Sequence, residues 1–335
     1  MKEPRPSRTT PADAELLIGG QALIEGVLMR SPGAYGIAVR RPDGSLAIQR
    51  GKVSPLAKRW PLLKLPLLRG VAVLFQSLFL GIQALNFSAL EAAVELPAEG
   101  EESVGKPAAK ESSKWAVVGS MVVGLGLGVV IFLLVPLWLT ELAQKYLFGE
   151  MPSLAFNLFD GVLRGLFFLI YIVAISRMKD IHRVFQYHGA EHKVVFAWES
   201  KNGLTVENAR VQSRLHPRCG TSFLLFVLLV SIILFALIPK TAPFLIKFGG
   251  RLVLVPLIAG VSYEVLRLTA KRSASPVFAV LVAPGLALQR ITTQEPTDDM
   301  LHVAIVALEE ALREDGLLPE NVLPMQTPEE APALA

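Results

Sequence analysis

Four long apolar runs dominate the sequence and limit what this chain can fold into. About 20 apolar residues in a helix cross the hydrocarbon core of a bilayer, and soluble domains carry roughly a quarter charged residues. Here only 19% of the 335 residues are charged. We therefore predict a mainly α, polytopic membrane protein with four transmembrane helices, two in residues 115–176 and two in 222–268. The runs are Trp115–Trp138, Leu154–Ser176, Ser222–Ile238 and Leu252–Leu268.

The distribution of Lys and Arg predicts the orientation of these helices. Segment 177–221 carries eight such residues and segment 1–69 carries twelve, whereas loops 139–153 and 239–251 carry one and three. Basic residues are retained on the cytoplasmic side of a membrane. We therefore expect both termini and the 177–221 loop to be cytoplasmic. A net charge of +4, with the basic residues beside apolar runs, gives no indication of a nucleic-acid partner.

Two further apolar runs do not fit a simple span. Val71–Leu85 is interrupted by polar residues, and a crossing there would place the basic N-terminal region outside the cell. We predict that 61–90 forms an amphipathic or re-entrant, half-embedded helix; the alternative is a true fifth span with an inverted N-terminus. Val277–Leu288 is short and contains a proline, so it is assigned to a membrane-associated part of 269–315.

A small cytosolic β element is predicted in residues 19–60. Alternating apolar residues indicate strands at Ala22–Met29, Tyr35–Arg41 and Ser45–Gln49. Pro42-Asp43-Gly44 joins the last two as a hairpin turn, in which glycine supplies the positive φ angle.

The remaining segments are expected to lie outside the membrane. Residues 1–18 and 316–335 are predicted to be disordered tails, and 91–114 a polar linker. Asp298–Arg313 shows the apolar periodicity of an amphipathic helix. Its apolar face is expected to pack on the cytosolic part of the protein, with a cytosolic protein partner as the alternative.

The strongest indication of chemistry is His188-Gly189-Ala190-Glu191-His192, in the 177–221 loop. If Arg183–Glu199 is helical, His188 and His192 lie one turn apart on one face and can bind one Zn²⁺ or another divalent metal ion. The order His-x-x-Glu-His is that of inverted zinc peptidases, in which the glutamate acts as general base toward water. Glu191 is accordingly the predicted catalytic residue.

A second cluster, His216-Pro217-Arg218-Cys219, supplies two more candidate zinc ligands. Binding by His188, His192, His216 and Cys219 together would close the coordination sphere, as in structural sites. A catalytic zinc usually keeps three protein ligands and one open position. The sequence leaves both arrangements open.

Glu264 is a further candidate metal ligand. It lies near the cytosolic end of the last predicted span, and inverted zinc peptidases take their third ligand from a downstream glutamate. The alternative is an ion pair with Arg267 or Lys271 on the same helix.

Two functions follow from these candidates. We favour a membrane protein with a membrane-proximal zinc site that performs hydrolysis. The alternative is a non-catalytic scaffold in which zinc holds the 177–221 loop and a cytosolic partner binds. Asp160 and Arg164, four residues apart inside the second span, together with Glu264, suggest transport as a third function. The alternative is that Asp160 and Arg164 neutralise each other within the bundle.

Three motifs look like the signatures of the YqhQ-type family. Its members are bacterial multi-pass membrane proteins of unknown function that are described as predicted metal-dependent enzymes. The resemblance extends from Gly19 to Arg313, implies location in the bacterial inner (plasma) membrane, and supports a metal ion at the two histidine clusters, without supplying a reaction. The motifs are Gly19–Arg30, Phe185–Lys193 and His216–Ser222.

Overall fold

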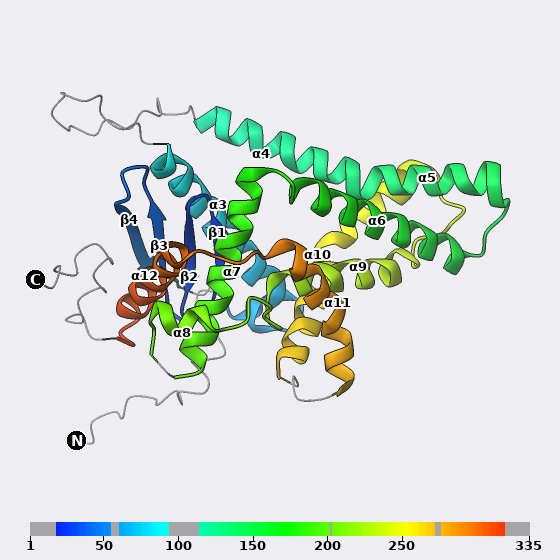
Figure 1. Cartoon of the computed structure of the whole chain (residues 1–335). Helices are drawn as coiled ribbons and strands as arrows, with labels where there is room; N and C mark the ends of the chain where they lie inside the picture. The colour runs from blue at the N-terminus through cyan, green and yellow to red at the C-terminus, as the bar shows by residue number, and fades with distance from the viewer. Residues whose placement is uncertain (1–17, 55–59, 94–113, 202, 272–275, 319–335) are drawn as a thin grey trace, which may run out of the picture.

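The computed structural model describes residues 18–54, 60–93, 114–201, 203–271 and 276–318. Most of the expected tails (1–18, 316–335) and of the expected linker (91–114) falls outside these ranges. One four-stranded sheet stands beside a group of long helices (Figure 1), which confirms the mainly α, polytopic architecture.

The elements follow one another in this order. The strands are β1 (Gly19–Leu23), β2 (Gly26–Arg30), β3 (Ala34–Arg40) and β4 (Leu46–Lys52). The helices are η1 (Pro61–Lys64), α3 (Leu68–Ala92), α4 (Lys114–Val129), η2 (Val130–Leu134), α5 (Val135–Ala143), η3 (Gln144–Phe148), α6 (Ser153–Ile175), α7 (Lys179–Glu199), α8 (Val206–Arg210), α9 (Gly220–Phe235), α10 (Phe244–Lys271), α11 (Pro276–Thr292) and α12 (Asp298–Glu314).

The sheet is an antiparallel meander in the order β1-β2-β3-β4. The single strand expected at Ala22–Met29 is wrong, because the chain reverses at Ile24 and Glu25 and forms β1 and β2 instead. Glu25 adopts a φ of 52°, and its carboxylate accepts two hydrogen bonds of 2.5 Å from Arg183 on α7. This contact joins residues far apart in the sequence, and neither central residue of the turn is a glycine or asparagine, although Gly26 follows at the start of β2.

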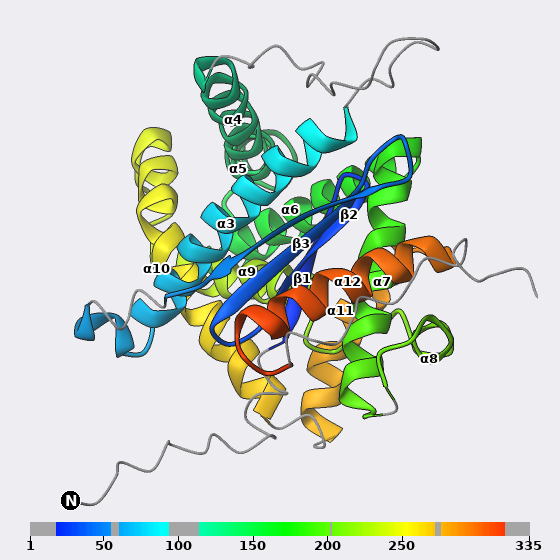
Figure 2. The same cartoon turned by 90° about the vertical axis from the view of Figure 1, so that its left-hand side faces the viewer.

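Both faces of the sheet are covered by helices (Figure 2). On one face, α12 and α7 pack on β1–β3, and Gly36 lets α12 approach so closely that a Cβ there would lie 2.3 Å from the Ala307 carbonyl oxygen. The C-terminal helix thus packs on the protein's own sheet, as expected. On the other face, Leu80 and Ala84 of α3 pack with Leu28 and other sheet residues.

Among the described residues, four helices are long and apolar enough to cross a membrane, and one of the four is not among the predicted spans. They are Leu68–Ala92, Val122–Phe148, Ser153–Ile175 and Phe244–Thr269. The span expected at Ser222–Ile238 is instead α9, with 16 residues. At 1.5 Å per residue it is about 24 Å long, shorter than the roughly 30 Å of a hydrocarbon core.

The position of α3 limits how it can meet the bilayer. Its second half lies on the sheet, where Arg41 donates a hydrogen bond of 2.7 Å to Glu91. Its first half meets α10, with Gly70 against Tyr263. Phe79 and its apolar neighbours on the outer face are exposed. A helix half covered by the sheet is not surrounded by lipid along its length, so these contacts favour the half-embedded placement, which stays a prediction.

Spin labels would test the placement of α3. Nitroxides on cysteines introduced at the exposed positions Leu68, Phe75, Phe79 and Leu85 should report one similar, shallow depth in liposomes. The reason is that an interfacial helix sinks only about 5–10 Å. A label at exposed Leu166 of α6 is the control and should lie near the bilayer centre. A depth that changes steadily from Leu68 to Leu85 would identify α3 as a true span.

Candidate metal centre

The helix α7 presents the histidine motif on one side, as its spacing predicts. His188 and His192 are four residues apart and point to the same face of Lys179–Glu199. Gly189, between them, allows a backbone segment to pass close by. A Cβ at this position would lie 2.1 Å from the carbonyl oxygen of Gln294, in the connection between α11 and α12.

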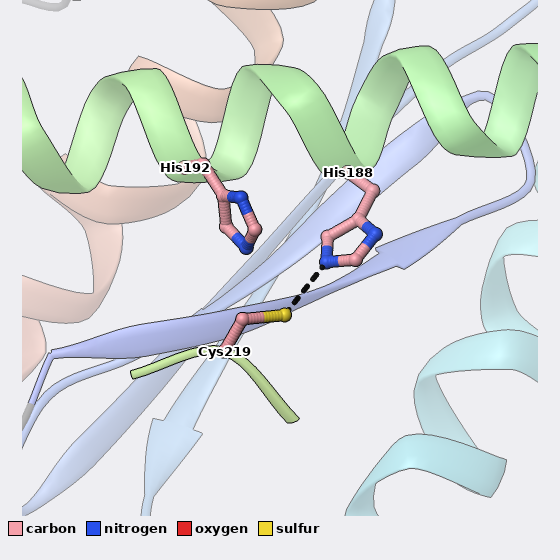
Figure 3. Close-up of side chains that lie close together, drawn as sticks. All are labelled: His188, His192 and Cys219. Carbon is pink, nitrogen blue, oxygen red and sulfur yellow. Dashed lines mark hydrogen bonds between the residues drawn. The ribbon is translucent and has the colours of Figure 1, made fainter. Parts of the chain in front are cut away.

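Three potential metal ligands converge beside α7. The ligand atoms of His188, His192 and Cys219 all lie within 4.8 Å of one another. Figure 3 shows both rings directed from α7 toward the sulfur, with Nε2 of His188 3.2 Å from Sγ. The structure therefore brings together one residue of the His-Pro-Arg-Cys cluster and both histidines of the pentapeptide.

The two histidines of α7 are oriented by backbone carbonyl groups. Nδ1 of His188 lies 2.8 Å from the Thr292 oxygen, and Nδ1 of His192 lies 2.6 Å from the Arg214 oxygen. A carbonyl accepts only, so each Nδ1 carries the proton and each Nε2 keeps its lone pair. Nε2 of His192 is buried and has no hydrogen-bond partner among the described residues. Such carbonyl contacts are typical of metal-binding histidines, and the donor set fits a zinc ion.

Cys219 forms the N-cap of α9. Its sulfur accepts hydrogen bonds from the backbone N–H and the hydroxyl of Thr221, at 3.5 and 3.4 Å. These donors and the partial positive charge of the helix N-terminus face the sulfur as an acceptor. The thiol is buried and faces His188.

His216 lies beside this group of candidate ligands but has different hydrogen-bond partners. Its Nδ1 accepts a hydrogen bond of 3.3 Å from the N–H of Arg218, so the proton of the neutral ring resides on Nε2. Burial lowers the pKa of His216, against a smaller opposing effect of Glu191. Gln289 fixes the backbone of His216 through two hydrogen bonds of 2.8 Å. His216 is outside the three-ligand group.

Glu191 lies beside the group and is held by β1. Its Oε1 accepts a hydrogen bond of 2.8 Å from the N–H of Gly20, and its Oε2 lies 4.0 Å from Nε2 of His188. A Cβ on Gly20 would lie 2.9 Å from Cγ of Glu191. Because Gly20 has no side chain, there is room beside β1 for the carboxylate of Glu191. The sequence marks this only by two successive glycines, whose role in the site the pattern did not reveal.

Glu264 is not brought to the histidines. Its carboxylate pairs with Arg69 on α3, with 2.7 Å from Nε to Oε1, and accepts a weaker bond of 3.4 Å from the N–H of Leu67. The carboxylate thus pairs with a residue of another helix and not with the candidate metal ligands. The pair joins α10 to the start of α3.

A cavity of about 350 Å³ opens beside the histidines. Apolar residues from the segment before β1, from α7 and from α9 line one part of it, and Glu191 and the candidate ligands line another. Because only three residues separate the end of α6 from the start of α7, and α9 begins directly after Cys219, the cavity lies where the long helices meet the sheet. The apolar residues are Ile18, Ala22, Val184, Phe185, Val195 and Leu224.

Comparisons with known proteins agree with the motifs. The model of a family described as "Protein of unknown function (DUF1385)" matches residues 65–314. The chain is also similar to "Uncharacterized protein YqhQ" of Bacillus subtilis (strain 168), with 37% identity over 313 residues, which cover 91% of this chain and 95% of the relative. No solved structure matches the chain. The expected resemblance is confirmed, and the chain belongs to the DUF1385 family of YqhQ-like proteins.

Proposed function

We propose that this protein is a metal-dependent hydrolase of the bacterial inner membrane, with a zinc site on the cytoplasmic side. In this proposal His188, His192 and Cys219 bind the ion, and Glu191 is the general base. The observation that carries the proposal is the position of Glu191. Its carboxylate is fixed by Gly20, and its Oε2 lies 4.0 Å from the ligand nitrogen of His188. A purely structural site has no need of this carboxylate.

The hydrogen bonds of His216 support an open coordination position. A closed site of four ligands would need a lone pair from His216, but its Nδ1 accepts from the Arg218 N–H, and its Nε2, buried and without a hydrogen-bond partner among the described residues, lies outside the three-ligand group. The three remaining donors match the number that catalytic zinc sites use. Glu264, paired with Arg69, is not needed in this set.

In the proposed hydrolysis, the residues of the site have separate roles. A zinc ion supplies Lewis acidity, which polarises a substrate carbonyl or phosphoryl group and makes water more acidic. Glu191 accepts the proton of the attacking water and passes it to the leaving group. The N–H of Gly20 holds one carboxylate oxygen and leaves the other facing the ligands. The apolar part of the cavity excludes bulk water from the reacting groups.

Metal analysis of purified variants tests the ligand set. His188→Ala, His192→Ala and Cys219→Ser are each expected to lose stoichiometric zinc, as measured by plasma mass spectrometry, because each removes one of three donors. His216→Ala should keep the ion, and the exposed His182, replaced by Ala, is the matched control. In cobalt-loaded protein, Cys219→Ser should also lose the sulfur-to-cobalt charge-transfer band. Zinc loss in His216→Ala as complete as in His188→Ala would establish the closed, structural site.

Glu191→Gln separates catalysis from metal binding. The amide keeps the shape of the side chain but cannot accept a proton, so zinc content should stay unchanged. Zinc-dependent hydrolysis of p-nitrophenyl acetate in detergent solution should fall on the order of 10²- to 10⁴-fold. An unchanged rate, in a variant that retains its zinc, would rule out Glu191 as the base.

Gly20→Ala tests how the base is held. The added methyl group would lie 2.4 Å from the Leu28 carbonyl oxygen, 2.8 Å from Sδ of Met29 and 2.9 Å from Cγ of Glu191, so β1 must shift relative to the carboxylate. A displacement of about 1 Å can reduce the rate on the order of 10²-fold. Gly19→Ala is the matched control, because a Cβ there meets nothing within 4 Å. Zinc content should be equal in both variants, and equal rates would show that Gly20 does not position Glu191.

A further inference from the structure

A second polar centre lies at the end of the helical bundle away from the sheet (Figure 1). Lys240, Lys247 and Arg251 line one small cavity there, together with Asn157 and three apolar residues. Among the described residues that line it, none is a carboxylate. The lining of this cavity would therefore attract a negatively charged group.

The carboxylates nearby leave this centre with an excess of positive charge. Asp160 is shared between Arg164, with which it pairs four residues apart, and Arg251, at 2.7 Å. Glu141 lies 2.5 Å from Lys247. Lys240 donates to a neutral group, the carbonyl oxygen of Met151, at 3.1 Å. Among these six side chains two acids face four bases, an excess of two positive charges, and the exposed Lys145 and Glu150 beside Glu141 offset one another.

Burial makes this excess costly. Arg164 is 7% exposed and Arg251 2% exposed, and the two share the single carboxylate of Asp160, whereas buried charges require partners. One aromatic ring, Phe235, lies under both arginines, 4.7 Å from Arg164 and 4.9 Å from Arg251, and it cannot neutralise either. Ionisable groups inside a membrane bundle are usually retained for a function. The positive charge also stands at the end opposite to the basic cytosolic segments, against the usual distribution.

We propose that this cavity binds a phosphate oxyanion, carried by an anionic phospholipid headgroup or free in solution. The free space is about 10 Å³, roughly the room of one water molecule. One phosphate oxygen therefore enters between Lys247 and Arg251, while the rest of the group stays at the bundle surface beside the partly exposed Lys240. Guanidinium and ammonium groups are the usual phosphate ligands of proteins. The site is separate from the metal centre and does not depend on the proposed hydrolysis.

Thermal unfolding of the full-length protein in neutral detergent tests this site. Phosphatidylglycerol in mixed micelles should raise the unfolding midpoint by several degrees, with phosphatidylcholine as the matched neutral lipid. Inorganic phosphate is compared with chloride at equal ionic strength, and native mass spectrometry counts the bound molecules. A response to phosphatidylglycerol alone identifies the headgroup, and a response to inorganic phosphate identifies the free anion. No response to either overturns the proposal.

Lys240→Gln provides the specific variant, because this partly exposed residue can change without disturbing the buried ion pairs. It should weaken the apparent affinity on the order of tenfold. The exposed Lys145, at the same end but outside the cavity lining, is replaced by Gln as the control and should leave the affinity unchanged. An equal loss in both variants would show that general surface charge, and not this cavity, attracts the anion.

Discussion

The close packing of α7 against the start of the sheet is the contact on which the rest of the site depends. It requires two glycines. Gly20 in β1 leaves room for the Glu191 side chain, and Gly189 in α7 leaves room for the Gln294 carbonyl. Either position, with a Cβ, would force the helix away from its neighbours. Because the helix is fixed on both sides, the direction of His188 and His192 is set before any ion binds.

The same packing explains why the site stands at the boundary between the bundle and the sheet. The helix α7 follows α6 after a short connection, so one of its ends is tied to the bundle while its buried face lies on the sheet and α12. Cys219 arrives from the other direction, as the N-cap of α9. The cavity at this site has an apolar part, which includes Val184, Phe185 and Leu224, and a polar part made by Glu191 and the candidate ligands. Substrates with an apolar and a polar part suit such a cavity.

The sequence predicts the features of the fold that depend on local periodicity. It does not predict those that depend on contacts between residues far apart in the chain. The spacing of His188 and His192 predicts their common face, and Pro42-Asp43-Gly44 predicts a turn that forms with Gly44 at a φ of 86°. The turn at Glu25 is missed because Arg183 stabilises it from another element. The partner of Glu264 is missed for the same reason, since Arg69 lies on a different helix.

The short helix α9 shows how the two polar centres constrain one another. Its first residue follows Cys219, which faces the histidines, and its last residue, Phe235, lies under Arg164 and Arg251. Both ends are therefore occupied by polar contacts, and an insertion would displace one of them. A helix of 16 residues holds the two centres about 24 Å apart. Hydropathy alone extends the predicted span to Ile238. The reason is that hydropathy depends on the apolar side chains and not on the contacts at which a helix ends. The length of α9 thus matches the separation of the contacts that Cys219 and Phe235 make at its two ends.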